Sequence, residues 1–270
     1  MDTILEQLAA VQEVDCLNAH DYHDILTGNV PVVMRGLVKY WPLVSKAQQS
    51  LSALSEYLLR FDSGQTVEAM LAAPSEKGRL FYGESLQQFN FKLMRGRFAD
   101  AFEILAELEH QSECPTFYIG SAPIADYFPG LERECSLKLF TEEVIPNIWI
   151  GNRTRVATHN DDAHNIACVA AGRRKFTLFP PDQEENLYIA DTNISPGGRP
   201  ISLIDLNAPD MEKFPHFSKA IKVGLVTILN PGDALYIPTN WWHNVEALES
   251  VNILINYWWK AFLPVVVGSR

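Results

Sequence analysis

The sequence lacks long apolar runs: no window holds about 18 consecutive apolar residues, which is the least that a membrane-spanning helix needs. The first residues, Met1 to Glu6, also lack the basic start and apolar stretch of a signal peptide. We therefore expect no contact with a membrane and predict a cytoplasmic protein.

Cysteine is scarce and scattered. The four cysteines are Cys16, Cys114, Cys135 and Cys168, and no two of them form a C-x-x-C pair. Disulfide frameworks and zinc–thiolate sites both depend on paired or closely spaced cysteines. We expect neither, which agrees with a reducing compartment.

Basic residues are also in short supply. The chain has 22 Lys and Arg against 33 Asp and Glu, a formal net charge of −11. Non-specific nucleic-acid binding needs a basic surface that displaces counterions, so we predict no nucleic-acid partner. A basic protein or peptide remains compatible with this charge.

What the sequence does hold is an ordinary globular composition: 270 residues, 47% of them hydrophobic, without repeats or low-complexity tracts. Residues 1–114 mix helical and extended patterns. Helices are predicted at Thr3–Val14, at Ser50–Phe61, and from a capping-box pattern at Asp100 to about Glu109. Short strands are predicted at Pro31–Met34, Leu80–Tyr82 and Phe89–Phe91.

From residue 115 to 260 the pattern changes to short β-segments separated by Gly, Pro and Asn, which is typical of a sandwich or barrel. The predicted strands are Thr116–Ile119, Asn147–Ile150, Arg155–His159, Asn165–Ala170, Lys175–Phe179, Val226–Leu229, Ala234–Ile237 and Val251–Trp259. Residues 182–222 form a long insertion, and loops of that length are usually functional or partly ordered. We predict one domain over 1–270, mainly β, with helices outside a barrel core.

One pair of segments points to a metal. On a strand, residues i and i+2 face the same side, so His159 and Asp161 are expected to point together. His243 follows a predicted strand and is expected to supply a third ligand from a neighbouring strand. Two histidines and one carboxylate leave three coordination positions open, which is the facial triad of non-haem Fe(II) oxygenases.

Other interpretations of these histidines stand beside this one. H-x-D also occurs in proteins that bind no metal, and His243 can equally be a buried histidine bonded to a backbone carbonyl. His164 lies at an odd offset from His159 and is predicted not to be a ligand. Surface or loop positions are expected for the remaining histidines, which are His20, His23, His110 and His216.

Four stretches in order carry a family resemblance: Thr158 to Asn165, Ala171 to Pro181, Pro231 to His243, and Val251 to Trp258. They resemble the cupin-like branch of the JmjC oxygenases. Their order and spacing are similar to those of the asparaginyl hydroxylase that inhibits the hypoxia-inducible factor, and to bacterial cupin-like proteins of this branch. The segment Pro31 to Pro42 also resembles the family's stretch before the barrel.

The resemblance implies a double-stranded β-helix, a jelly-roll barrel of the cupin type. It also implies Fe(II) held by His159, Asp161 and His243, with 2-oxoglutarate and O2 as cosubstrates. Arg174 stands where the family keeps a basic residue for the distal carboxylate of 2-oxoglutarate.

The strand pattern gives separate support for Arg174. Arg174 shares an apolar face with Phe176 and Leu178, whereas the alternate residues Arg173, Lys175 and Thr177 are polar and expected to face outward. An arginine on an apolar face needs an anionic partner. A structural ion pair is the alternative for Arg174, and Lys175 takes its place if the register is shifted by one.

Three more residues join the predicted cosubstrate site. Tyr118 resembles the family tyrosine that contacts the same carboxylate, or else is a barrel-core tyrosine. Asn165 lies at an even offset from His159 and can face the site, and Asn256 stands where the family has an asparagine near the cosubstrate. A buried asparagine needs hydrogen-bond partners, so backbone bridging is the alternative for both.

The sequence also departs from the family. Val156 stands where the animal enzyme has a hydroxyl side chain, Asn160 where tyrosine is common, and the helical pair that the animal enzyme uses to dimerise is not recognisable in Phe262 to Arg270. We predict a hydroxylase, with N-demethylation open and the oligomeric state unassigned. Its substrate is a polypeptide or a small molecule. The alternatives are a metal-binding cupin module without turnover, and a cupin isomerase or hydrolase with another metal.

Overall fold

A computed structural model of the chain describes residues 4–15, 19–137, 144 and 146–260. Cys16 and the tail from Phe262, on which the sequence makes predictions, lie outside these described residues. The three described cysteines, Cys114, Cys135 and Cys168, are free thiols.

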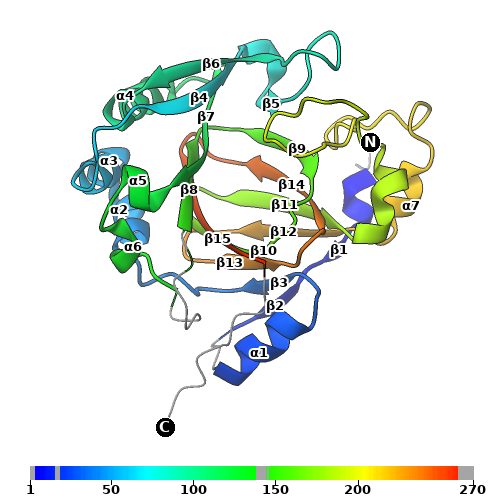
Figure 1. The fold of residues 1–270 in the computed structure, drawn as a ribbon, viewed down its shortest axis with the longest axis horizontal. Helices are drawn as coiled ribbons and strands as arrows, with labels where there is room; N and C mark the ends of the chain where they lie inside the picture. Colours follow the sequence, from blue (N-terminus) through cyan, green and yellow to red (C-terminus); the bar gives the residue numbers. More distant parts are fainter. Residues whose placement is uncertain (1–3, 16–18, 138–143, 145, 261–270) are drawn as a thin grey trace.

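Two β-sheets wrap around one another into a barrel (Figure 1). The six-stranded sheet contains, in spatial order, β1 (Ala9–Ala10), β12 (Leu225–Leu229), β11 (Arg174–Phe179), β14 (Trp242–Ala247), β9 (Arg155–His159) and β5 (Arg79–Leu80). The nine-stranded sheet contains β2 (Gln12–Val14), β3 (Val32–Met34), β13 (Ala234–Ile237), β10 (His164–Ala171), β15 (Asn252–Trp259), β8 (Pro146–Gly151), β7 (Thr116–Pro123), β4 (Val67–Ala72) and β6 (Phe91–Gly96). The predicted jelly-roll barrel is confirmed.

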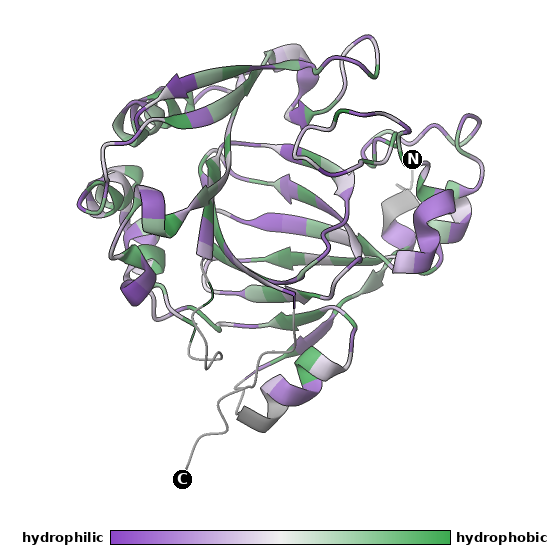
Figure 2. Cartoon of the chain, viewed as in Figure 1, coloured by the Kyte–Doolittle hydropathy of each residue, from purple (hydrophilic) through white to green (hydrophobic). Residues whose placement is uncertain are grey.

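Strand alternation separates an inner from an outer apolar face in the larger sheet. On β15, Leu254 packs with the apolar residues inside the barrel, whereas Ile253 and Ile255 join the cluster outside it. On β10, Val169 and Cys168 divide in the same way. In Figure 2 the strands β10, β13 and β15 are mostly green, while β11 and β14 carry purple, hydrophilic residues.

The outer face of the larger sheet is covered by helices (Figure 1). These are α2 (Pro42–Gln49), α3 (Leu51–Leu59), α4 (Phe98–Leu108), α5 (Ile124–Tyr127) and α6 (Leu131–Glu134). Their fully buried side chains, such as Leu43, Leu58 and Phe98, pack in one cluster with Ile166 and Ile255 of the sheet. The remaining helix near the N-terminus is α1 (Ala19–Thr27), and the short 3-10 turn η2 spans Pro74–Glu76. Burial of this apolar face fixes the sheet that carries half of the site.

Two predicted helices are present and one is not. In α3 the Ser50 hydroxyl accepts from the Ala53 amide at 3.1 Å, an N-cap. In α4 the helix begins at Phe98 rather than at Asp100, because Asp100 is the third helical residue and accepts from the Arg97 amide at 3.0 Å.

The predicted helix at Thr3–Val14 is wrong over its described residues. After the short 3-10 turn η1 (Ile4–Gln7), the chain runs as β1 and then β2. The Ala9 and Val11 amides donate to Gly224 and Val226 of the smaller sheet, and β2 pairs with β3 of the larger one. Hydrogen bonds to two sheet edges therefore outweigh the local helical preference.

Most of the predicted barrel strands agree with the structure to within a few residues, and Ala234–Ile237 and Arg155–His159 agree at both ends. β4 and β14 were not predicted. The predicted strand at Leu80–Tyr82 shortens to Arg79–Leu80, and Phe89 forms only an isolated bridge with Tyr82.

The insertion 182–222 is packed rather than open. It begins within η3 (Pro181–Leu187) and includes α7 (Phe217–Ile221). Its apolar side chains form a cluster with Phe179 and Trp242 of the smaller sheet; the buried members from the insertion are Leu187, Ile204, Leu206, Phe214, Phe217, Ala220 and Ile221. Isolated bridges join Ile189 to Ser202 and Ile201 to His159, so the insertion lies along the edge of β9.

The turn between β10 and β11 requires glycine. Gly172 has φ +68°, and a Cβ there would lie 2.3 Å from Asn252 Oδ1 and 2.5 Å from the Val251 carbonyl oxygen. Only a residue without a side chain fits, and this tight turn sets where Arg174 begins its strand. In the part of the chain that the structure describes, no helix has the length and apolar character needed to cross a membrane.

Candidate active site

His159 and His243 lie directly opposite one another on the neighbouring antiparallel strands β9 and β14. Their ring centroids are 4.3 Å apart. Opposed residues of an antiparallel pair have Cβ atoms about 5 Å apart, so the two imidazoles share one space inside the barrel. The register between β9 and β14 is irregular here, pairing Val156 with Val245, and this turns Val156 inward as well.

Asp161 reaches the same space by a different route from the one predicted. It lies in the loop after β9 and not on the strand, so the i, i+2 alternation does not apply. The loop is tied down because the Asp161 carbonyl accepts from the Asn240 amide at 2.8 Å. One potential ligand atom from each of His159, Asp161 and His243 lies within 4.8 Å of the others. The set offers two imidazoles and one carboxylate to one ion.

Backbone carbonyls orient both imidazoles. His159 Nδ1 lies 2.8 Å from the Ala157 carbonyl oxygen, and His243 Nδ1 lies 3.0 Å from that of Trp241. A carbonyl only accepts, so Nδ1 carries the proton and the Nε2 lone pair points to the shared space. The backbone bond considered as an alternative for His243 therefore exists and leaves Nε2 available. His243 Nε2 is 3.7 Å from Asp161 Oδ2.

The protonation state also suits a metal. Burial of the ring, reinforced by the neighbouring His243, lowers the pKa of His159 to about 4. The imidazole is then neutral at neutral pH, which is the form that coordinates a metal.

A pocket of about 60 Å3 opens behind the triad, between the two sheets. We call it the inner pocket. Its polar lining comes from strands of both sheets and from the loop after β9, and comprises Tyr118, His159, Asp161, Asn165, Arg174, His243 and Asn256. All seven residues predicted for the metal and cosubstrate sites are thus brought together in one place.

Arg174 lies at the far end of this set with its charge poorly satisfied. Its side chain is 2% exposed, and among the described residues its Nε and Nη2 atoms have no hydrogen-bond partner. Burial lowers the pKa of Arg174, and the adjacent Tyr118 hydroxyl partly opposes this. Burial likewise raises the pKa of Tyr118, so this hydroxyl keeps its proton. A buried guanidinium with free N–H groups is costly unless an anion binds it.

The neighbours of Arg174 on β11 face the other way. Lys175 pairs with Glu246, and Arg173 pairs with Glu249 at 2.7 Å. The structure therefore places Arg174, and not Lys175, in the inner pocket. Thr177 lies on the same outward face as Lys175, as expected, but it is buried because the insertion packs over the adjacent Phe179 and Trp242 at that end of the sheet.

The two asparagines bond to side chains rather than to the backbone. Asn256 Oδ1 accepts from the Trp149 indole at 2.8 Å, and its Nδ2 donates to Asn165 Oδ1 at 3.3 Å. Asn165 faces the pocket as expected, but the offset argument for it was wrong, because β9 ends at His159 and Asn165 belongs to a strand of the other sheet. This chain of bonds fixes one wall of the inner pocket.

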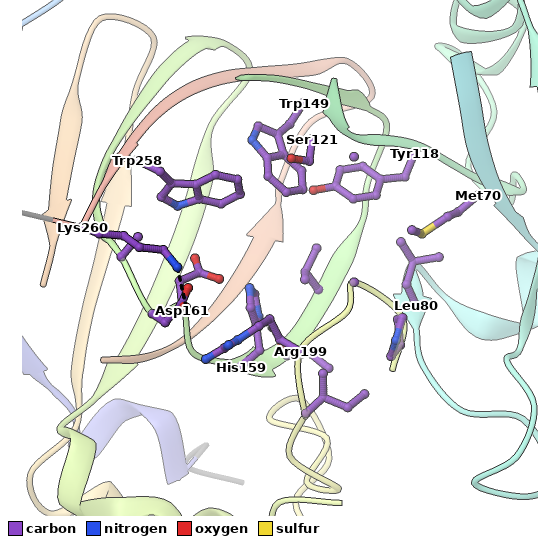
Figure 3. Close-up of a pocket in the computed structure, with 18 of the residues that line it drawn as sticks. Met70, Leu80, Tyr118, Ser121, Trp149, His159, Asp161, Arg199, Trp258 and Lys260 are labelled. Carbon is purple, nitrogen blue, oxygen red and sulfur yellow. Dashed lines mark hydrogen bonds and ion pairs between the residues drawn. The ribbon is translucent and has the colours of Figure 1, made fainter. Parts of the chain in front are cut away.

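On the other side of the triad lies a larger space of about 490 Å3, which we call the outer cavity (Figure 3). Its walls are mainly apolar and aromatic and include Met70, Leu80, Trp149, Val156, Ile201 and Trp258. The insertion contributes Pro196, Gly197 and Arg199. Figure 3 shows Trp149, Tyr118, Met70 and Trp258 on one side and His159 with Arg199 on the other. His159 and Asp161 line both spaces, so the triad stands at their junction.

Three lining residues were missed from the sequence. Trp258 lies two residues after Asn256 on β15, so strand alternation could have predicted it, and Trp149 faces inward opposite to Ile148 and Ile150. Arg199 lies in a loop with no periodic signal. His164 lies outside the metal set as predicted: its Nδ1 is 2.9 Å from the Tyr236 hydroxyl and its ring stacks on Trp259.

Comparison with known proteins agrees with this geometry. The sequence profile described as "Cupin-like domain" matches residues 18–263. The chain belongs to the cupin-like domain family. The matched residues include the strands from β3 to β15 and the helices from α1 to α7.

Curated relatives of this cupin-like chain include proteins with JmjC names. It is 27% identical to "Lysine-specific demethylase JMJ31" of Arabidopsis thaliana, across 92% of this chain and 49% of that protein. It is 25% identical to "Lysine-specific demethylase 8" of Xenopus tropicalis, across 95% of this chain and 54% of that protein. A match to rat "HSPB1-associated protein 1" is 36% identical over 114 residues, 41% of this chain and 23% of that protein. The chain thus spans about half the length of the first two.

Proposed function

We propose that this cupin-like chain is an Fe(II)- and 2-oxoglutarate-dependent oxygenase that hydroxylates its substrate. The observation that carries the proposal is the inner pocket, which joins a His-Asp-His set to a buried arginine with unpartnered nitrogens. A metal alone would explain the triad, and a structural ion pair would explain the arginine. A dianion that binds a metal at the triad with one end and Arg174 with the other accounts for both features.

The donor groups fit the two components. His159 Nε2, His243 Nε2 and the Asp161 carboxylate would hold Fe(II) and leave the remaining positions open. Arg174 and the Tyr118 hydroxyl would hold the distal carboxylate of 2-oxoglutarate, since a guanidinium matches a carboxylate with two parallel bonds. When bound, Fe(II) with 2-oxoglutarate and O2 supplies the oxidation of a substrate C–H bond, with release of succinate and CO2.

The chain's own side chains prepare this chemistry. The Ala157 and Trp241 carbonyls hold both imidazoles in the ligating tautomer. Val156, Trp149 and Trp258 line both spaces and keep water from the junction. Val156 offers no hydroxyl to the cosubstrate, so Asn165 and Asn256 are the polar groups that would orient it besides Arg174 and Tyr118.

The kind of product follows from the substrate. Hydroxylation of a carbon gives a stable alcohol, whereas hydroxylation of an N-methyl group gives a product that releases formaldehyde. The names of the relatives from Arabidopsis and Xenopus support demethylation. The likeness to an asparaginyl hydroxylase and to bacterial members of the branch supports a stable hydroxylation and stays a prediction. Both a polypeptide and a small molecule remain substrates under this proposal.

An anaerobic titration tests the proposal. Adding 2-oxoglutarate to the chain with Fe(II) is expected to produce the weak visible charge-transfer band of a chelated keto acid, and admitting O2 is expected to produce succinate. A band without succinate would identify a binding module instead of an oxygenase. Absence of the band with Fe(II) bound would overturn the cosubstrate site.

A further inference from the structure

The charged residues in the walls of the outer cavity balance in number, but both carboxylates have other partners. Among the described residues its charged lining consists of Asp161, Asp162, Arg199 and Lys260. Asp161 belongs to the metal set, and Asp162 accepts from Lys260 Nζ at 2.9 Å. Arg199 is the member that has no carboxylate partner within the described ranges.

Arg199 is nevertheless held firmly. Its Nε donates to the Asn160 carbonyl oxygen at 2.8 Å and its Nη2 to Asn160 Oδ1 at 3.1 Å. Both acceptors are neutral groups, so these bonds do not offset the positive charge of the guanidinium. Asn160 stands between His159 and Asp161 in the chain, so these bonds hold the charge beside the metal set (Figure 3). The third nitrogen, Nη1, makes no hydrogen bond among the described residues.

A second donor in the same walls lacks an acceptor. The indole nitrogen of Trp258 is buried and has no hydrogen-bond partner in the described part of the chain. In contrast, the indole of Trp149 next to it donates to Asn256. A buried N–H without an acceptor is unfavourable. The described lining therefore holds one guanidinium nitrogen without a hydrogen bond, while its two carboxylates belong to the triad and to the Lys260 ion pair.

We propose that the substrate of the outer cavity is an apolar or aromatic molecule with one anionic group, a carboxylate or a phosphate, which Arg199 binds. The apolar body would lie against Met70, Leu80 and Trp149, and the anion would accept from the guanidinium. This inference rests on the proposed function, because it identifies the molecule beside the metal as the substrate. An amine would meet Arg199 without any free carboxylate to pair with, so the cavity selects against cations.

Calorimetric titration with matched probes tests the inference. The chain is loaded with Mn(II) and N-oxalylglycine, so that a carboxylate probe finds the Arg174 end occupied. The probes are 4-phenylbutyrate, 4-phenylbutyl phosphate, 4-phenylbutan-1-ol and 4-phenylbutylammonium, which differ only in the end group. At least one anion is expected to bind about tenfold tighter than the alcohol and the ammonium, and the tighter anion identifies carboxylate or phosphate.

Variants assign the preference to Arg199. Arg199→Gln is expected to abolish the preference for the anionic probe, and Arg199→Lys is expected to retain part of that preference. Asp162→Asn is expected to increase it, because Lys260 is then released. Arg95→Gln removes the same charge at a 78% exposed side chain outside the cavity lining and is expected to change nothing. Equal or tighter binding of the alcohol or the ammonium, or an unchanged preference in Arg199→Gln, would overturn the inference.

Failure of the proposed function is recognised separately. If Mn(II) and N-oxalylglycine do not bind, the cosubstrate site is wrong, whatever Arg199 does. The same probes are then compared on Arg174→Gln, where the inner cation is absent and the preference at Arg199 can still be measured. Loss of the preference on that variant with retained folding would overturn the inference as well.

Discussion

The inner pocket and the outer cavity share the triad but are built differently. The polar groups of the inner pocket lie on strands apart from Asp161, and its volume is about 60 Å3. The outer cavity is about 490 Å3, and its charged walls come from the loop after β9, the end of β15 and the insertion. Strands hold side chains rigidly, whereas loops can vary without disturbing the barrel. Under the proposed function, this difference fits a fixed site for the cosubstrate and an adaptable one for the substrate.

The largest effect is expected at the junction of the two spaces. Asp161→Ala or His243→Ala should reduce substrate-independent succinate production by more than about 100-fold. Each removes a proposed ligand atom, and this should cost more activity than removal of a group that only supports a ligand, which costs about 10- to 100-fold. His164→Ala is the matched control outside the metal set and should retain turnover. Thermal melting shows that each variant is folded. Unchanged turnover in either triad variant would contradict the metal assignment.

The next largest effect separates the two faces of β11. Arg174→Ala should weaken 2-oxoglutarate binding by about 2–5 kcal/mol, since a buried charged partner is lost. Lys175→Ala should leave it within about threefold, because Lys175 pairs with Glu246 on the outside of the barrel. The measurement is the 2-oxoglutarate concentration for half-maximal succinate formation. The reverse order would mean that the register of β11 is wrong.

A smaller effect is expected within the wall of the inner pocket. Asn256→Ala leaves the Trp149 indole and Asn165 Oδ1 without their partner and should lower the free energy of unfolding by about 1–3 kcal/mol. Urea denaturation measures this, with the exposed Asn207→Ala as the control. Equal stability of the two variants would show that the asparagine bonds do not hold the wall.

The smallest effect is expected at the mouth of the outer cavity. Lys260 and Asp162 have side chains 72% and 60% exposed, so solvent screens their attraction. Lys260→Gln should therefore leave the melting temperature and the 2-oxoglutarate requirement unchanged. A clear change of the melting temperature or of the 2-oxoglutarate requirement would show that the entrance of the outer cavity is as rigid as the inner pocket. The contrast between the two spaces would then not hold.

The strand-borne part of the site could be predicted from sequence. The alternation Arg174, Phe176, Leu178 identified which basic residue faces inward, because period 2 is a property of every strand. The same rule was misapplied to Asp161 and Asn165, since it holds only within one strand and β9 ends at His159. Both residues still face the inner pocket. Asp161 does so from the loop after β9, and Asn165 does so from β10 of the larger sheet.

The rest depends on contacts between distant segments. The N-terminal residues around Ala9 become strands only because two sheet edges accept them. Arg199 acquires its role from Asn160, 39 positions away, and no local pattern in the insertion records that contact. His243 was expected on a neighbouring strand, but Trp242–Ala247 was not among the predicted strands because it lacks a clear alternation.

The two bonds from Arg199 to Asn160 have a thermodynamic consequence. Asn160 separates His159 and Asp161 of the candidate triad, so the insertion is hydrogen-bonded to the segment that would hold the metal under the proposed function. Under that proposal, a ligand that alters the Arg199–Asn160 bonds would change the affinity for the metal, and the metal would change the affinity for that ligand by the same factor. Binding in the outer cavity and binding at the triad would then be linked reciprocally through Asn160.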